Sequence, residues 1–269
     1  MNKPLAIDLF CGLGGWSDGL LAEGWDVIGF DIERHACDGE CYPGRLVIQD
    51  ALTLHGRQFK DADLIVASPP CQEYSYMAMP WSRAKAKAAA IRADTTGAEI
   101  ERLNRLFNAC FRIQREACES AGRHIPMVVE NVRGANPWVG RARWNFGSYY
   151  LWGDVPAIMP PVAAKVLKAG IAHHPDGATN FHRDLNNGLK VPGFRFDGSG
   201  GSFQTASVEG IKGSQGYERD HPNALGSKKP GTSSKSPARK AASARIAKIP
   251  ETLARYVARH YLPREQVAA

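Results

Sequence analysis

The sequence predicts an α/β fold in which a mostly parallel sheet carries helices on both faces. Short apolar runs of strand length alternate with helical patterns over the first 132 residues. These runs are continuous rather than alternating, which is typical of strands that are buried on both faces. The chain has 269 residues, of which 43% are hydrophobic, enough for one domain with a sizeable core or a core domain with a small appendage.

Five apolar runs are expected to form the parallel strands. They are Leu5–Phe10, Asp26–Ile32, Arg45–Asp50, Ala62–Ala67 and Ile125–Val129. Pro69 and Pro70 end the fourth run, because proline cannot donate to a sheet ladder. Tyr149–Trp152 is a further candidate strand.

Two helices are predicted between these strands. Ser17–Glu23 is helical in pattern and is closed by Gly24. The clearest helix follows Thr96 and Glu99, which have capping-box spacing, and its apolar residues repeat every three or four positions until Gly122. The strand–helix alternation favours a doubly wound sheet.

Other parts of the chain have a different character. Glu73–Gly97 is a long polar stretch, and Pro156–Ser236 lacks sustained periodicity, which indicates a small irregular domain or a loop region. Helical character returns in Ala241–Leu262, with Pro250 expected in the first turn of a helix.

The charge distribution indicates a polyanionic partner. The formal net charge is +7, and the segment Gly226–Ala269 contains ten basic against two acidic residues. A solvated run of lysines is the alternative interpretation. We expect a cytoplasmic protein without a membrane span, because the sequence has neither a signal-peptide pattern nor a long apolar run and its 6 cysteines do not form a disulfide framework.

A glycine-rich motif follows the first predicted strand. Asp8–Gly15 reads DLFCGLGG, and its glycines allow the backbone to turn tightly and to approach a ligand. Asp31 ends the second strand, where a carboxylate can bind ribose hydroxyls. The pattern predicts a nucleotide-type cofactor site. A plain strand–helix turn with Asp31 as a helix N-cap would give the same residues.

Two further motifs follow the fourth and fifth strands. Ser68–Gln72 reads SPPCQ and presents Cys71 on a stiff loop, which suits a nucleophile, although an inert buried cysteine is the alternative. Glu130–Val132 reads ENV. Because the ends of parallel strands share one edge, we expect Glu130 near Cys71, where an acid can donate a proton or hydrogen bond to a substrate. Alternatively, Glu130 caps the next turn.

The three motifs, in this order and at these spacings, resemble those of the C5-cytosine DNA methyltransferase family over about half of the chain. The resemblance implies a Rossmann-like methyltransferase fold with a small irregular recognition region, S-adenosylmethionine as the methyl donor, and double-stranded DNA as the partner. The short length and the missing auxiliary regions indicate an enzyme of phage, prophage or mobile-element type, which we expect to act as a monomer. The motifs identify no accompanying restriction enzyme.

The resemblance also implies residue roles. Cys71 attacks C6 of a flipped cytosine, and Glu130 holds N3. Arg143, in an Arg-x-Arg element in which Val139 replaces the usual Gln, contacts O2, unless it is an ordinary surface arginine. The implied cofactor-binding residues are Phe10, Gly12, Gly14, Asp31 at the ribose, Asp50 at the adenine amino group, and Pro70. The implied substrate-binding residues are Gln72, Ser75 and Asn131.

Three segments are expected from this resemblance: residues 1–158 as the S-adenosylmethionine-binding catalytic domain, 159–236 as a small target-recognition region or loop, and 237–269 as a helix returning to the catalytic domain. That helix could equally be plain packing through Leu253 and Val257. No metal site is expected, because His35, Cys37 and Cys41 lack a fourth ligand.

Two other functions stay open from the sequence. One is an enzyme that modifies C5 of cytosine in RNA or in a nucleotide. The other is a catalytically weak DNA-binding protein that retains the fold.

Overall fold

The computed structural model describes residues 3–37, 39–75, 81–147, 149–158 and 247–263. The chain divides into two compact units, and the first contains residues 1–34, 41–160 and 249–269. The described part of the second unit is limited to residues 35–37, 39–40 and 247–248. The expected recognition region, 159–236, lies outside the described residues.

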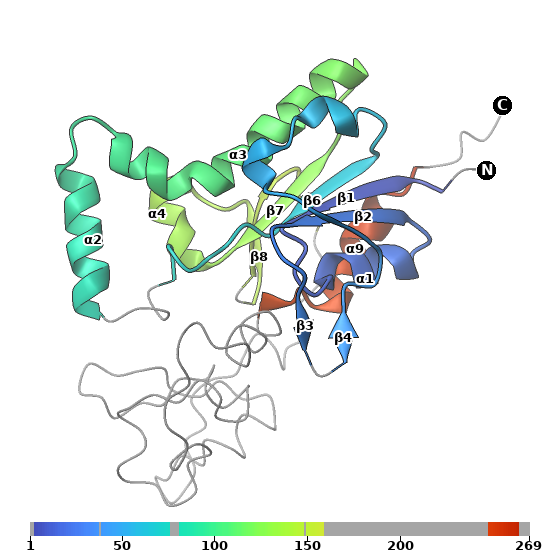
Figure 1. Ribbon diagram of the computed structural model, residues 1–269, viewed down its shortest axis with the longest axis horizontal. Helices are drawn as coiled ribbons and strands as arrows, with labels where there is room; N and C mark the ends of the chain where they lie inside the picture. The colour runs from blue at the N-terminus through green and yellow to red at the C-terminus, as the bar shows by residue number, and fades with distance from the viewer. Residues whose placement is uncertain (1–2, 38, 76–80, 148, 159–246, 264–269) are drawn as a thin grey trace, which may run out of the picture. The chain divides into compact units, whose positions relative to one another are not determined.

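A seven-stranded sheet forms the centre of the first unit, in the order β5-β2-β1-β6-β7-β9-β8 (Figure 1). The strands are β1 (Leu5–Leu9), β2 (Asp26–Asp31), β5 (Arg45–Ile48), β6 (Leu64–Ala67), β7 (Met127–Asn131), β8 (Trp144–Phe146) and β9 (Tyr149–Gly153). The first five strands of that order pair in parallel, whereas β9 is antiparallel to both β7 and β8. The predicted mostly parallel, Rossmann-like α/β fold is confirmed.

The strand order places a switch point between β1 and β6. From β1 the chain builds one half of the sheet through β2 and β5, and then returns to β6 and β7 on the other side of β1. Loops on the two sides of a switch point diverge, and ligands of open α/β sheets bind in the crevice that this leaves beyond the carboxyl ends of the strands. The three predicted motifs lie at the carboxyl ends of β1, β6 and β7, so all three are at this edge.

Helices cover both faces of the sheet (Figure 1). The helices α1 (Gly15–Ala22) and α9 (Glu251–Tyr261) pack on one face, where Trp16 and Leu253 share a buried cluster with Val66. The long α3 (Ala98–Ala121) packs on the other, where Phe107 shares a cluster with Ile65. Neighbouring strand residues therefore both find apolar partners, which explains the continuous apolar runs.

Several boundaries differ from the prediction. The polar stretch contains a helix, α2 (Trp81–Ala93). The sequence analysis missed it because the helix consists mainly of alanines and basic residues and has no apolar stripe. Gly97, and not Thr96, is the N-cap of α3. The capping-box prediction was wrong because Asp94 takes its place, accepting a hydrogen bond from the Glu99 N–H at 2.8 Å. Pro250 is the N-cap of α9 rather than a first-turn residue.

The remaining elements are short. They are β3 (Ala36–Cys37), β4 (Glu40–Cys41), α4 (Asn136–Val139) and the 3₁₀ turns η1 (Ala51–Thr53), η2 (Gly56–Phe59) and η4 (Arg133–Ala135). Within the described ranges, no helix combines the length and the apolar character needed to cross a lipid bilayer.

Candidate active site at the carboxyl edge of the sheet

The glycine-rich turn after β1 has an unusual backbone. Phe10 has a φ of 57°, and Gly12 and Gly14 have φ values of 54° and 80°, all in the left-handed region. The Gly12 N–H donates a 2.9 Å hydrogen bond to Oδ2 of Asp31, which joins the turn to the end of β2. A Cβ at Gly12 would meet nothing within 4 Å, so there is open space beside this turn.

Two carboxylates follow the neighbouring strands β2 and β5. Asp31 ends β2, and its second oxygen accepts a 3.3 Å hydrogen bond from the Glu33 N–H. Asp50 is the N-cap of η1 and accepts from the Leu52 N–H at 2.9 Å. Both side chains therefore hold local backbone, and both stand at the edge where the cofactor site is predicted. Within the described residues no helix begins after Asp31, because β2 is followed by β3, so the alternative that Asp31 is a helix N-cap was wrong.

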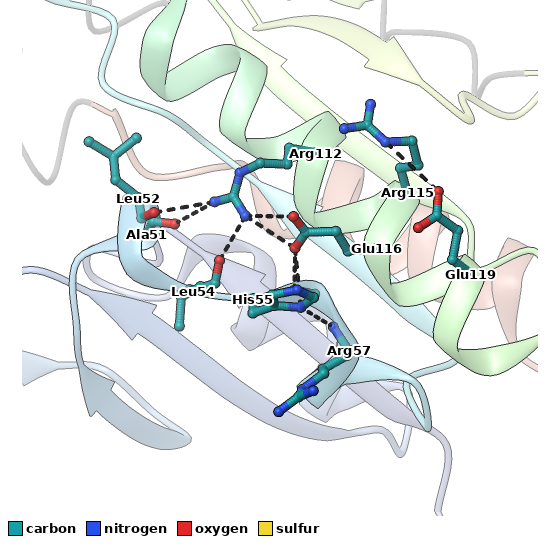
Figure 2. A network of polar contacts seen from close by, with 10 residues as sticks. Ala51, Leu52, Leu54, His55, Arg57, Arg112, Arg115, Glu116 and Glu119 are labelled. Carbon is teal, nitrogen blue, oxygen red and sulfur yellow. Dashed lines mark hydrogen bonds and ion pairs between the residues drawn. The ribbon is translucent and has the colours of Figure 1, made fainter.

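A network from α3 fixes the chain after Asp50 (Figure 2). Arg112 donates to the carbonyl oxygen of Leu54 at 2.9 Å and to a carboxyl oxygen of Glu116 at 3.0 Å. The Glu116 carboxylate also accepts a 2.7 Å hydrogen bond from the Gly56 N–H. Burial would raise the pKa of Glu116, but the Gly56 and Arg112 hydrogen bonds outweigh it and hold this pKa below its ordinary value. The position of Asp50 thus depends on a charged pair in another element.

The loop after β6 presents Cys71. The amide nitrogens of Tyr74 and Ser75 donate to the carbonyl oxygen of Cys71 at 3.0 and 2.9 Å, so the chain turns directly after this residue. The Tyr74 hydroxyl donates a 3.0 Å hydrogen bond to Oδ1 of Asn104, which anchors this turn to α3. Cys71 itself is half-buried, and its neighbours Pro70 and Gln72 are exposed.

Glu130 lies on the strand next to this loop. Ala67 of β6 is opposite Val129 of β7, so the next residues, Ser68 and Glu130, are neighbours with side chains on the same face. Glu130 is only 9% exposed. Burial raises its pKa to about 8, against the opposing effect of a side-chain hydrogen bond with Ser68. At neutral pH Glu130 is therefore mostly protonated and able to donate a hydrogen bond.

Asn131 ties the two strand ends together. Its Nδ2 donates a 2.8 Å hydrogen bond to the carbonyl oxygen of Pro69, and its Oδ1 accepts from the Val132 N–H at 2.9 Å. The side chain is almost fully buried. Both polar ends of the amide are bonded to backbone, so Asn131 positions the Cys71 loop relative to the strand that carries Glu130.

The structure does not bring every predicted residue to this group. Arg143 lies just before β8 and is exposed, and β9 separates its strand from β7. Its backbone N–H donates to the Leu151 carbonyl oxygen at 2.9 Å. Ser75 is half-buried in the turn after Cys71.

One buried polar cluster was not predicted. Asp8, in the middle of β1, accepts a 2.6 Å hydrogen bond from Ser17 of α1, whose hydroxyl also lies 2.7 Å from the Tyr42 hydroxyl. Burial raises the pKa of Asp8 to about 7. The only signal in the sequence was a charged residue inside an apolar run. The cluster fixes the first turn of α1 beneath the glycine-rich motif.

The protein is thus a Rossmann-like α/β protein. At the carboxyl edge of its sheet, a candidate nucleophile, Cys71, and a buried acid, Glu130, belong to neighbouring strand ends. Residues 5–95 match the family model for C-5 cytosine-specific DNA methylase. This match confirms the predicted resemblance to that family over that range, which includes the Asp8–Gly15 and Ser68–Gln72 motifs. The motif with Glu130 lies beyond it.

Solved structures give a more distant likeness. A protein described as a DNA modification methyltransferase encoded within an E. coli prophage is 24% identical over 49% of this chain and 33% of its own, with a TM-score of 0.32. The S. pombe Dnmt2 methyltransferase is 16% identical over 50% of this chain and 36% of its own, with a TM-score of 0.30. The Entamoeba histolytica methyltransferase EhMeth is 14% identical over 51% and 40%, also with a TM-score of 0.30.

The chain thus spans about a third of the length of these solved structures. No curated protein matches it.

Proposed function

We propose that this protein transfers a methyl group from S-adenosylmethionine to C5 of cytosine in double-stranded DNA, through a covalent bond between Cys71 and C6. The observation that carries the proposal is the coupling of two strand ends. The Asn131 side chain bonds to Pro69, two residues before Cys71, while the adjacent residue, Glu130, is a buried acid with a pKa of about 8. The buried amide of Asn131 thereby holds the loop of the proposed nucleophile, Cys71, beside the strand that carries the proposed acid, Glu130.

The residues at the other half of the edge fit the methyl donor. The open space beside Gly12 admits a ligand against the backbone, and Phe10 adds an apolar side chain at the end of β1. Asp31 and Asp50 supply carboxylates for the ribose hydroxyls and the adenine amino group, and Pro70 lies on the Cys71 loop. S-adenosylmethionine would supply an electrophilic methyl group at this position.

The chemistry that the side chains perform follows from the reactivity of cytosine. C5 is a poor nucleophile in the intact ring, and addition of the Cys71 sulfur to C6 gives it enamine character. Glu130 donates a hydrogen bond to N3, which stabilises the charge that develops on the ring during this addition. After C5 has gained its methyl group, loss of the C5 proton to a base restores the double bond and expels the Cys71 thiolate.

The helix α2, which follows the Cys71 loop in the sequence, is basic. The sequence of α2, WSRAKAKAAAIRA, contains basic residues and no acidic one. Lys87 forms an ion pair with Glu73 beside the loop, and the Arg92 guanidinium lies 5.7 Å from the centre of the Trp138 ring. These contacts connect α2 with Glu73, two residues after Cys71, and with Trp138 of α4. A basic element beside the nucleophile favours a polyanionic substrate.

A methyl-transfer assay tests the proposal. Purified protein is incubated with radiolabelled S-adenosylmethionine and either cytosine-containing duplex DNA or RNA of the same sequence. We expect label in the DNA, its loss in Cys71→Ser, and its retention in the control Cys41→Ser, which changes an exposed cysteine. Glu130→Gln should lower the rate by about 10²-fold or more, as for other general acids. Methylation that survives Cys71→Ser, or that requires RNA, would contradict the proposal.

A further inference from the structure

The indole ring of Trp16 joins the first turn of α1 to the loop that carries Cys71. Its Nε1 donates a 3.0 Å hydrogen bond to Oγ of Ser68, 52 positions further along the chain. Trp16 directly follows the glycine-rich motif, and Ser68 begins the segment that leads to Cys71. Trp16 is only 2% exposed, so its N–H is shielded from water. The hydrogen bond therefore spans the two sides of the switch point between β1 and β6.

The surroundings of Trp16 fix the position of its ring. The ring belongs to the buried cluster that α1 and α9 form with the sheet, together with Val66 and Leu253. Next to it, a Cβ at Gly15 would come within 2.3 Å of the backbone nitrogen of Ile249. Such close packing leaves the first turn of α1 little room to shift, so the indole N–H is presented from a fixed position.

Ser68 receives this hydrogen bond at the first residue after β6. Its own N–H donates to the carbonyl oxygen of Leu9 at 3.1 Å, which continues the pairing of β6 with β1 by one residue. The backbone and the side chain of Ser68 are thus both attached to the segment that contains β1 and α1. Cys71 follows after two prolines, whose fixed φ angles restrict the path of the chain. A displacement at Ser68 would therefore be transmitted to Cys71.

We propose that Trp16 is a positioning residue that couples cofactor binding at the glycine-rich turn to the placement of Cys71. The inference rests on the proposed function, which assigns the cofactor to this turn and the nucleophilic role to Cys71. A cofactor bound against Gly12 and Gly14 restrains the turn from which α1 begins, and the hydrogen bond to Ser68 extends that restraint to the loop. By linkage, a loop that is held in place favours cofactor binding to the same extent. The methyl donor and the attacking sulfur are thereby brought into one arrangement, which the reaction needs.

Trp25 supplies a matched control. It precedes β2, is 1% exposed and belongs to the same buried cluster as Trp16. Its indole donates to the carbonyl oxygen of Ala258 at 3.3 Å, so this hydrogen bond leads to α9 and not to the Cys71 loop. Trp25→Phe therefore removes a comparable ring and hydrogen bond, and it separates a general loss of packing from a loss of the coupling.

The first test measures the accessibility of Cys71 without cofactor or DNA. Iodoacetamide is added to the purified protein, and mass spectrometry follows alkylation of the peptide that contains Cys71. Trp16→Phe and Ser68→Ala should each speed this alkylation about fivefold, the effect of one buried hydrogen bond, and the double variant should be no faster than either. Ser68→Thr, which keeps a hydroxyl acceptor, and Trp25→Phe should react at the wild-type rate. A wild-type rate in both Trp16→Phe and Ser68→Ala would overturn the inference.

The second test repeats the alkylation with saturating S-adenosylhomocysteine, the demethylated form of the proposed donor. This ligand should slow the alkylation of Cys71 about fivefold in the wild type and in Trp25→Phe, but less than about twofold in Trp16→Phe and Ser68→Ala. By reciprocity, calorimetry should show S-adenosylhomocysteine binding weakened about fivefold in Ser68→Ala and restored in Ser68→Thr. Direct shielding of the sulfur by the ligand would instead survive in Trp16→Phe and Ser68→Ala, and this result would contradict the coupling.

The two tests separate this inference from the function on which it rests. A wild-type protein that binds no S-adenosylhomocysteine would contradict the proposed function, and faster alkylation in Trp16→Phe would then still support the positioning of Cys71 by Trp16. A wild-type protein that methylates DNA, with full cofactor dependence of the alkylation in Trp16→Phe and Ser68→Ala, would contradict only the coupling.

Discussion

The side-chain amide of Asn131 donates a 2.8 Å hydrogen bond to the carbonyl oxygen of Pro69 and thereby joins the strand that carries Glu130 to the loop that carries Cys71. Backbone pairing between β6 and β7 does not extend to this point, because β6 has ended by Ala67 and the following loop contains two prolines without N–H donors. This buried side chain therefore contributes to the relative position of the Cys71 loop and Glu130.

Removing this amide should loosen the Cys71 loop. Asn131→Ala leaves the Pro69 carbonyl and the Val132 N–H without their partner, so urea denaturation should show a loss of about 1–3 kcal/mol. Methyl transfer should fall as well. The control Asn145→Ala removes an exposed amide bonded to the Gly147 carbonyl oxygen and should change stability by roughly 0.5 kcal/mol or less. Equal losses in the two variants would mean that the Asn131 tie has no special importance.

The open space at Gly12 allows a direct test of the cofactor site. Gly12 and Gly24 both have positive φ values, and a Cβ at either would meet nothing within 4 Å. Gly12→Ala and Gly24→Ala should thus have similar backbone strain, about 1–2 kcal/mol. We expect only Gly12→Ala to weaken S-adenosylmethionine binding in calorimetry, because its methyl group enters the proposed site. Wild-type affinity in Gly12→Ala would place the cofactor elsewhere.

The network around Arg112 should support Asp50 from a distance (Figure 2). Arg112→Met removes hydrogen bonds to backbone carbonyls and the pair with Glu116, which should cost about 2 kcal/mol. One turn further along α3, Arg115 and Glu119 are 4.0 Å apart and exposed, so Arg115→Met should cost roughly 0.5 kcal/mol or less. Thermal unfolding of both variants checks this difference. A similar melting temperature for the two would show that the network contributes little.

Stability should decrease as the pH rises. Folding raises the pKa of Asp8 from 3.8 to about 7 and that of Glu130 from 4.5 to about 8, in both cases mainly through burial. Between these values the folded protein binds more protons than the unfolded chain, so the free energy of unfolding falls with increasing pH and levels off above the folded pKa.

Replacing either group by its amide should flatten this dependence. Urea denaturation between about pH 5 and about pH 8 would show a smaller loss of stability for Asp8→Asn and Glu130→Gln than for the wild type. Slopes equal to the wild-type slope would mean that these carboxyl groups have ordinary pKa values in the folded protein.

The edge of the sheet could be predicted because strand ends are a local property. Apolar runs locate the strands, and the residues at or just after the end of each run, such as Asp31, Cys71 and Glu130, must then stand at one edge of a parallel sheet. The family resemblance rests on the same local motifs. A strand, helix or motif that is set by one continuous segment, through its apolar periodicity and its flanking glycine or proline residues, could therefore be predicted from the sequence.

The partners of these residues could not be predicted, because they come from distant segments. Nothing near Trp16 indicates that its indole meets Ser68, and nothing near Asn131 indicates Pro69. The helix α2 was missed because its sequence has no apolar stripe at helical spacing. Its alanines favour a helix through their intrinsic propensity, which is a weaker signal than periodicity. Arg143 was assigned a role at cytosine O2 from a short motif, and the structure places β9 between its strand and Glu130.

Covalent trapping tests the central claim most directly. Duplex DNA with 5-fluorocytosine cannot lose a proton from C5, so a sulfur–C6 bond formed during methylation should persist. With S-adenosylmethionine present, mass spectrometry should find the wild-type protein linked to the methylated DNA strand through the peptide that contains Cys71, and Cys71→Ser should give no adduct. An adduct through another residue, or methylation of ordinary DNA with no adduct on the fluorinated strand, would contradict a covalent mechanism through Cys71.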